Sequence, residues 1–280
     1  MMNMSRRQFC LASLLALAGA RPAMANGAPL RLGLMPVYGV RALMTRYEPM
    51  RAYVARILKQ PVRVETAPDF IRFLNRMLAD EFDIAVAAAH FARIAEQDAG
   101  WVPLAQFEPD HDTLLIGRAG ELPARPADLV GKEVAVIDRL AITVMAALQY
   151  LGKQGLKTDI DYRAVEYRNH SSVVHSLLSG ASTLAVTTSH GLQQIPSDLR
   201  ARVAVYRKLS DIPAFVIMGA PGMTKGSLER LRTAFLAFSQ EAEGLEFLAH
   251  NSYTRLHRAD EAAMRRADVF LRETRRMTGK

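Results

Sequence analysis

The sequence predicts an α/β protein organised as two units, and three observations support this prediction. The chain has 280 residues, and domains of about 150 residues would make two of it. Half of the residues are hydrophobic and 23% are charged, which is typical of globular proteins and not of disordered chains. Short β-rich segments alternate with amphipathic helical segments, as in α/β proteins with largely parallel sheets.

The first 25 residues have the features of an export signal. The pair Arg6 and Arg7 precedes a short apolar stretch, and the small-residue sequence Ala23–Ala25 follows it. The apolar stretch is shorter than the roughly 20 residues that span a bilayer. The arginine pair favours a twin-arginine signal, and an ordinary secretory signal is the alternative. We expect cleavage after Ala25.

Cleavage at this point changes the charge and the cysteine count. It removes Arg6, Arg7 and Arg21 and no acidic residue, so the formal charge falls from +8 to 8 − 3 = +5. It also removes Cys10, the one cysteine of the sequence, so the mature chain has no thiol and no disulfide. These features are consistent with a bacterial periplasm. Export disfavours nucleic acid as a partner, while the positive charge is compatible with an anionic ligand.

Periodicity and apolar runs define the elements of the first half. Apolar residues recur at helical spacing across Arg41–Lys59, which predicts a helix. A second helix is expected over Asp69–Leu78, starting at Pro68-Asp69. Phe82–Ala87 is almost entirely apolar, as expected of a strand that is buried on both faces. The expected strands are Leu30–Val37, Val62–Thr66, Phe82–Ala87, Trp101–Phe107 and Thr113–Arg118.

A proline-rich connector, Gly120–Asp128, separates this half from a second alternating series. The strands expected after it are Glu133–Ile137, Tyr162–Tyr167, Leu184–Thr188, Val203–Leu209 and Ala214–Gly219. The expected helices are Ala141–Leu151, Ser171–Ser179, Ser227–Gln240, Glu243–Asn251 and Asp260–Met277. The last helix is rich in arginine, and we expect it to bury Met264, Val269 and Leu271; a basic helix on a membrane surface is the alternative.

Segments of this sequence resemble a known family. Leu30–Tyr38, Arg46–Met50, Thr66–Phe70 and Phe82–Ala85 have the order and spacing of the first lobe of the phosphate/phosphite/phosphonate-binding proteins of ABC importers. The second-half segments that continue the resemblance are Ala127–Val136, Asn169-His170 and Ile212-Pro213.

The resemblance implies a bilobal type II periplasmic-binding-protein fold, with two mostly parallel sheet lobes joined by two hinge strands. Lobe one would comprise residues 28–115 and 212–280 and lobe two residues 118–208, with crossings near Leu114–Arg118 and Leu209–Pro213. A small anion would lie in the cleft between the lobes, at helix N-termini that offer free N–H groups and positive dipole ends. The implied protein is a periplasmic monomer that hands a phosphate-, phosphite- or phosphonate-like oxyanion to an ABC permease, with no cofactor and no catalysed reaction.

The resemblance also implies which residues line the cleft, and some depart from the family pattern. A Ser-Thr-Ser-Gly run of the family becomes Asp138–Val144, in which Thr143 keeps a hydroxyl. The family's tyrosine is Phe70, and its Gly-Pro is Ala88-Ala89. Two acidic positions that could meet a ligand amine are also lost, which disfavours aminophosphonates. The implied ligand-binding positions are Tyr38, Asp69, Phe70, Ala89, His90, His111, Arg139, Thr143, His170, Ser171 and Thr188.

Three of these positions have a second interpretation. Asp69 precedes a helix and is expected to be its N-cap as well as a candidate contact. His170 precedes another helix, where it could meet an anion or serve a structural role. Arg139 could bind an oxyanion through two hydrogen bonds or be a surface arginine near a helix start.

Other functions have weaker support. His90, His111, His170 and His190 could bind a transition metal, but no pair has the spacing of known metal ligands. The sequence contains no G-x-S-x-G elbow, phosphate-binding loop or G-x-G-x-x-G motif that would indicate an enzyme. A sensor that docks on a membrane receptor or histidine kinase would use the same clamp, and the sequence does not distinguish it from an importer component.

Overall fold

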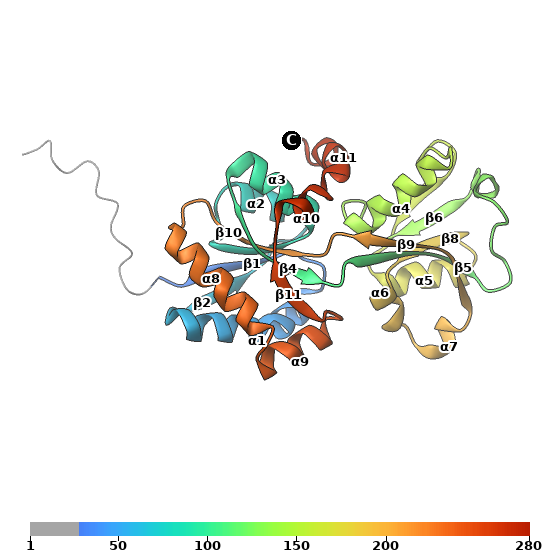
Figure 1. Cartoon of the computed structure of the whole chain (residues 1–280). Helices are drawn as coiled ribbons and strands as arrows, with labels where there is room; N and C mark the ends of the chain where they lie inside the picture. Colours follow the sequence, from blue (N-terminus) through green and yellow to red (C-terminus); the bar gives the residue numbers. More distant parts are fainter. Residues whose placement is uncertain (1–27) are drawn as a thin grey trace, which may run out of the picture.

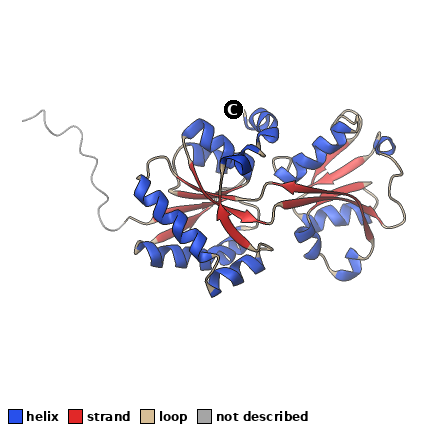
Figure 2. Ribbon diagram, in the orientation of Figure 1, coloured by secondary structure: helices blue, strands red, loops and turns tan. Residues whose placement is uncertain are grey.

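A computed structural model describes residues 28–280 as two α/β lobes lying side by side (Figure 1). Helices cover both faces of the sheet in each lobe (Figure 2). The predicted export signal and its cleavage site after Ala25 lie outside the described residues. No helix within residues 28–280 is long and apolar enough to cross a membrane.

The first lobe contains a mixed six-stranded sheet and most of the helices that flank it. Its strands are β1 (Leu30–Leu34), β2 (Val62–Glu65), β3 (Ile84–Ala87), β4 (Val102–Glu108), β10 (Val216–Gly219) and β11 (Arg255–Arg258). Its helices are α1 (Val40–Leu58), α2 (Phe70–Leu78), α3 (Ala89–Ala99), α8 (Lys225–Phe238), α9 (Ala242–His250), α10 (Glu261–Arg265) and α11 (Asp268–Thr278). The strand order is β11-β4-β10-β3-β1-β2, with β1 parallel to β2 and β3, and β10 antiparallel to both of its neighbours.

The second lobe contains a five-stranded sheet in the order β7-β6-β8-β5-β9. Its strands are β5 (His111–Arg118), β6 (Glu133–Val136), β7 (Arg163–Glu166), β8 (Leu184–Thr187) and β9 (Val203–Ile212). Its helices are α4 (Ile142–Lys153), α5 (His170–Leu178), α6 (Ser189–Gln193) and α7 (Ser197–Arg200). Strand β6 is parallel to β7 and β8, whereas β5 is antiparallel to β8 and β9. Both sheets are therefore mixed. The predicted parallel pairing holds only for β1 with β2 and β3, and for β6 with β7 and β8.

The chain crosses between the two sheets twice, at residues 109–110 and at residues 213–215. The first crossing comes earlier than predicted. His111 already pairs with Ile212 of β9, and Leu114 and Leu115 pair with β8, so residues 111–115 belong to the second sheet. The second crossing was predicted near Leu209–Pro213, but β9 extends to Ile212, so the crossing begins only at Pro213.

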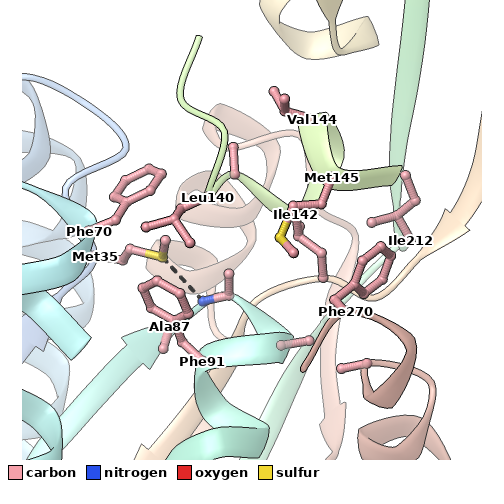
Figure 3. Close-up of a cluster of buried hydrophobic side chains, with 14 of the residues drawn as sticks. Met35, Phe70, Ala87, Phe91, Leu140, Ile142, Val144, Met145, Ile212 and Phe270 are labelled. Carbon is pink, nitrogen blue, oxygen red and sulfur yellow. Dashed lines mark hydrogen bonds between the residues drawn. The ribbon is translucent and has the colours of Figure 1, made fainter. Parts of the chain in front are cut away.

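Amphipathic helices build separate cores on each side of the sheets, and one core extends across both lobes. It includes Met35 and Phe70 of lobe one and Leu140 and Ile142 of lobe two (Figure 3). Phe270 of α11 joins the same core, and Gln149 Nε2 of α4 donates to the Val269 carbonyl at 3.0 Å. The C-terminal helix therefore contacts both lobes.

The predicted last helix is broken into α10 and α11, which changes its buried face. Met264 and Leu271 are buried, as expected, but Val269 is 66% exposed. The break before Asp268 resets the helical phase, so that Phe270 takes the inward position instead of Val269. The sequence pattern also did not predict α3 or β11, which complete lobe one.

Candidate functional site

A cavity of about 1100 Å³ lies between the two lobes and is lined by residues of both. Lobe one contributes the loops that follow β1, β2 and β3, and lobe two contributes the loops that follow β6, β7 and β8. These loops leave the carboxyl ends of the parallel strands, which is where open α/β sheets bind ligands. The cavity is therefore the candidate site.

Three of the helices that start at the cavity are capped by their own side chains. Asp69 Oδ1 accepts from the Arg72 N–H at 2.7 Å, so this residue is the N-cap of α2 as predicted, and it also lines the cavity. Asn169 Oδ1 accepts from the Ser172 N–H at 2.9 Å at the start of α5. Thr188 accepts from the Gly191 N–H at the start of α6. The side chains at these starts occupy part of the N–H groups that a ligand could use.

Helix α4 begins without such a cap. Its N-cap residue is Ala141, which has no side-chain acceptor, and Ala141, Ile142 and Thr143 line the cavity. The N–H groups of Ile142, Thr143 and Val144 have no hydrogen-bond acceptor among residues 28–280. These donors sit at the positive end of a twelve-residue helix. The start of α4 can therefore accept a negatively charged group.

His170 lies at the start of α5 with its ring held against the end of β8. Its Nδ1 is 2.9 Å from the Thr187 hydroxyl oxygen. Burial, with a smaller contribution from nearby His190, lowers the pKa of His170 to about 4, so the ring is neutral at pH 7. A Cβ at Gly191 would lie 2.7 Å from the His170 ring, so a glycine there makes room for it.

His190 connects the two lobes at the cavity. Its Nε2 is 3.4 Å from the Tyr38 hydroxyl, and its Nδ1 is 2.6 Å from the Ser252 hydroxyl. The guanidinium of Arg46 lies 4.6 Å from the Tyr38 ring centroid, a cation–π distance. The two His190 contacts join lobe two to the loop between β1 and α1 and to the loop after α9.

Carboxylates also line the cavity, and one of them, Asp138, has no cation beside it within residues 28–280. Asp138 Oδ1 accepts from the Leu140 N–H at 2.7 Å. Burial raises the pKa of Asp138, and the charges of Glu166 and Asp69 raise it further although the Leu140 N–H opposes the shift. Asp112 differs, because it lies 3.1 Å from the Lys208 ammonium and its pKa is lowered by bonds from Ser189 and Lys208 although burial opposes this. The cavity thus has acidic walls beside a positive helix end.

Most of the residues implied by the resemblance do line the cavity. They are Tyr38, Asp69, Phe70, His111, Thr143, His170, Ser171 and Thr188. Apart from His111, which begins β5 at the first crossing between the lobes, each lies between the carboxyl end of a strand and the first turn of the helix that follows it. Whether they bind a ligand remains a prediction.

Three implied residues lie elsewhere, which corrects the expected site. Ala89 and His90 are buried at the start of α3, and His90 Nε2 lies 3.0 Å from the Leu140 carbonyl. Arg139 faces a separate surface depression, where it pairs with Asp159. That ion pair and the Arg139 contacts with β7 turn its guanidinium away from the cavity. Of its two predicted interpretations, Arg139 therefore fits that of a surface arginine near a helix start.

Several cavity residues were not among those implied by the sequence. They include Tyr167, Arg168, Phe215 and Tyr253. Arg168 directly precedes Asn169-His170, so the helix start there was a usable signal. Phe215 and Tyr253 reach the cavity only because the chain returns to lobe one, and no local pattern marks them.

The histidines that suggested a metal site do not converge on one. Within residues 28–280, no group of three His, Cys, Asp or Glu side chains is arranged to hold a metal ion. His90 is buried away from the other three, and His111 packs edge-on against the Phe215 ring at 5.2 Å. Burial lowers the pKa of His111 to about 4, so its ring is neutral at pH 7.

Two mixed α/β lobes, joined by two crossings and enclosing a cleft at their strand ends, define a bilobal periplasmic binding protein. Residues 32–264 match the family of periplasmic substrate-binding proteins of ABC phosphonate transporters. The chain belongs to this family, which confirms the predicted fold class and the predicted role as the solute-binding component of an ABC importer. Members of the family are substrate-binding transport proteins.

Solved structures share the fold at low sequence identity. A binding protein of an ABC phosphonate transporter from Pseudomonas aeruginosa is 17% identical with a TM-score of 0.75, over 90% of this chain and 89% of its own. A Xanthomonas citri protein bound to ATP is 16% identical with a TM-score of 0.77, over 90% and 99% of the two chains. PhnD1 from Prochlorococcus marinus, in complex with methylphosphonate, is 10% identical with a TM-score of 0.73, over 90% and 98%. A search of curated proteins found no match.

Proposed function

We propose that this protein captures a solute with a phosphonate-like oxyanion in its interlobe cavity and delivers it to an ABC permease. The family membership gives the transport role, and the PhnD1 structure shows that this fold can hold methylphosphonate. The observation that carries the proposal for this chain is the uncapped start of α4, with the N–H groups of Ile142, Thr143 and Val144 available beside the cavity.

The residues around this helix start supply further donors. His170 is neutral, and when its Nδ1 accepts the Thr187 hydroxyl proton its own proton resides on Nε2, which can donate to an anion. Ser171 adds a hydroxyl, and Arg168 adds the positive charge that Arg139 was expected to provide. We propose that the oxyanion lies between the starts of α4 and α5, where backbone and side-chain donors meet.

Lobe one presents a second uncapped helix start at the same cavity. Gly39 is the N-cap of α1 and makes no side-chain hydrogen bond, and it lines the cavity together with Tyr38. Positive helix ends from both lobes would then face an anion between them. A ligand that touches both lobes stabilises their closed arrangement, and a permease can recognise that arrangement.

Ligand titration tests this proposal. We expect phosphate, phosphite or a phosphonate to raise the melting temperature of the mature protein, because a ligand at 100 times its Kd adds about 2.7 kcal/mol to the free energy of unfolding. Sulfate and chloride serve as controls for non-specific salt effects. A panel in which no phosphorus oxyanion raises the melting temperature above these controls would reject the proposal.

We also propose that the protein reaches the periplasm as a twin-arginine substrate and is cleaved after Ala25. The supporting features are the Arg6-Arg7 pair, the short apolar stretch and the Ala23–Ala25 sequence. Amino-terminal sequencing of the protein from a periplasmic fraction should begin at Asn26. Replacement of both arginines by lysine should leave the protein in the cytoplasm if the twin-arginine route is used.

A further inference from the structure

The cavity is large for a bare phosphonate. Its volume is about 1100 Å³, whereas pockets for drug-sized ligands span roughly 300–1,000 Å³. Methylphosphonate consists of one tetrahedral headgroup and one methyl group, so it would leave most of this space to water. The size of the cavity therefore points to a ligand with more than a headgroup, provided that the lobes cannot close much further.

Contacts that already join the lobes limit such closure. On one side, His90 Nε2 lies 3.0 Å from the Leu140 carbonyl, and Leu140 packs beside Met35 and Phe70 (Figure 3). Leu140 is 4% exposed and His90 is fully buried, so this contact lies within a packed core and not at the protein surface. A hinge motion that shrinks the cavity would have to compress this core, which protein interiors resist.

A second bridge joins the lobes at the cavity wall. His190 of lobe two lies 3.4 Å from the Tyr38 hydroxyl and 2.6 Å from the Ser252 hydroxyl, both of lobe one. Helix α11 adds a third link, because Phe270 lies in the core shared with α4 and Gln149 Nε2 donates to the Val269 carbonyl. The cavity volume of about 1100 Å³ is thus that of lobes already in contact.

The cavity walls also carry aromatic side chains that suit a carbon skeleton. Tyr38, Phe70, Tyr167, Phe215 and Tyr253 line the cavity from both lobes. The His111 ring packs between Phe215 and Tyr253, at 5.2 and 6.0 Å between ring centroids, and this fixes an aromatic surface at the hinge. Val37, with 37% of its surface exposed, adds an aliphatic side chain to the cavity lining.

The acidic walls limit how many negative charges the ligand can carry. Asp138 has no cation paired with its side chain among residues 28–280, and Glu166 and Asp69 lie near enough to influence it. A single oxyanion at the start of α4 is compensated by helix N–H groups, but a second phosphate in the cavity would add negative charge near these carboxylates without such donors. Like charges at such distances repel in a partly buried site.

We propose that the solute is an organic oxyanion with one charged headgroup on a bulky apolar or aromatic body. This inference rests on the proposed function, because it assumes that the headgroup binds at the start of α4. It adds that the body fills the aromatic part of the cavity between Tyr167, Phe215 and Tyr253.

Calorimetric titration of the mature protein with methylphosphonate, phenylphosphonate and ATP tests the inference. We expect phenylphosphonate to bind at least tenfold more tightly than methylphosphonate and ATP to bind more weakly than phenylphosphonate. Methylphosphonate binding as tightly as phenylphosphonate would overturn the inference and leave the proposed function intact. If ATP bound more tightly than phenylphosphonate, the inference that the solute carries a single charged headgroup would be overturned. Binding of no phosphonate would reject both.

A variant test uses the ratio of two affinities within one protein, which does not depend on how much of it is folded. Phe215→Leu keeps an apolar side chain but removes the ring, and it should reduce the phenylphosphonate preference over methylphosphonate by threefold or more. Val205→Leu is a matched control on an exposed part of β9 that is not a lining residue, and it should leave the ratio unchanged. An unchanged ratio in Phe215→Leu would contradict the aromatic contact.

Discussion

The substitution Ala141→Asp tests whether the start of α4 binds the oxyanion. Ala141 is the N-cap of this helix, with φ −65° and ψ 126°, and extended backbone of this kind suits a capping side chain. An aspartate here would accept from the N–H of Thr143 or Val144, which are the donors proposed for the ligand. The variant would therefore supply its own carboxylate where the oxyanion is expected.

The size of the effect follows from Coulomb's law. Two unit negative charges about 4 Å apart repel by about 4 kcal/mol at an effective dielectric constant of 20. Since about 1.4 kcal/mol corresponds to a tenfold change, the ligand Kd should rise about a thousandfold. The same cap should stabilise α4 by about 0.5–2 kcal/mol, offset by the cost of placing a carboxylate at a residue that is 9% exposed.

Calorimetry on the variant and on Ala141→Asn separates charge from shape. The asparagine can occupy the same N–H groups without a negative charge, so it should weaken binding much less than the aspartate. A circular dichroism melt of each variant confirms that it is folded. Unchanged affinity in folded Ala141→Asp would refute the assignment of the anion site to α4.

Three further predictions concern stability and the ring of His170. Gly191→Ala places a Cβ 2.7 Å from the His170 ring, so it should lower the free energy of unfolding by about 1–3 kcal/mol and weaken ligand binding. Urea denaturation measures the first effect and ligand titration the second. An unchanged urea midpoint together with an unchanged ligand Kd would contradict this packing. Burial lowers the pKa of His90 to about 3, and the pKa values of His111 and His170 to about 4 each, from an ordinary 6.5. As the pH falls, the unfolded chain therefore takes up protons before the folded chain does, so the stability should be complete above pH 6.5 and fall as the pH drops towards 4. His90→Gln should reduce the slope of melting temperature against pH. A slope equal to that of the unmodified protein would argue against a buried, neutral His90. Phe270→Ala should lower the free energy of unfolding by about 3–5 kcal/mol by removing the α11 contact with both lobes, whereas Val269→Ala, at an exposed position, should change it little.

The fold was largely predictable because its signals are local. Helical periodicity identified α1 and apolar runs identified β3, and their boundaries differ from the structure by one or two residues. The antiparallel orientation of β10 in the first sheet and of β5 in the second sheet was not predictable, because strand direction within a sheet depends on where the chain crosses between lobes. The exposed Val269 shows the same limit, since a short break in a helix changes which face is buried.

The candidate site was predictable where a strand end or a helix start marks it. Thr143, His170 and Asp69 lie at such positions, and all three line the cavity. Arg139 also lies near a helix start, but Asp159, twenty residues away along the chain, pairs with it and directs it outward. Partners brought together by the tertiary fold decide such cases, and a single sequence does not reveal them.

The most direct test of the account is a nuclear magnetic resonance titration of the mature protein with phenylphosphonate. The amide proton resonances of Ile142, Thr143 and Val144 should move downfield in a saturable manner, because these N–H groups gain an anionic acceptor. The amide of Leu140, which already donates to Asp138, should move less. Saturable binding that leaves the three α4 amides unshifted would contradict the central claim.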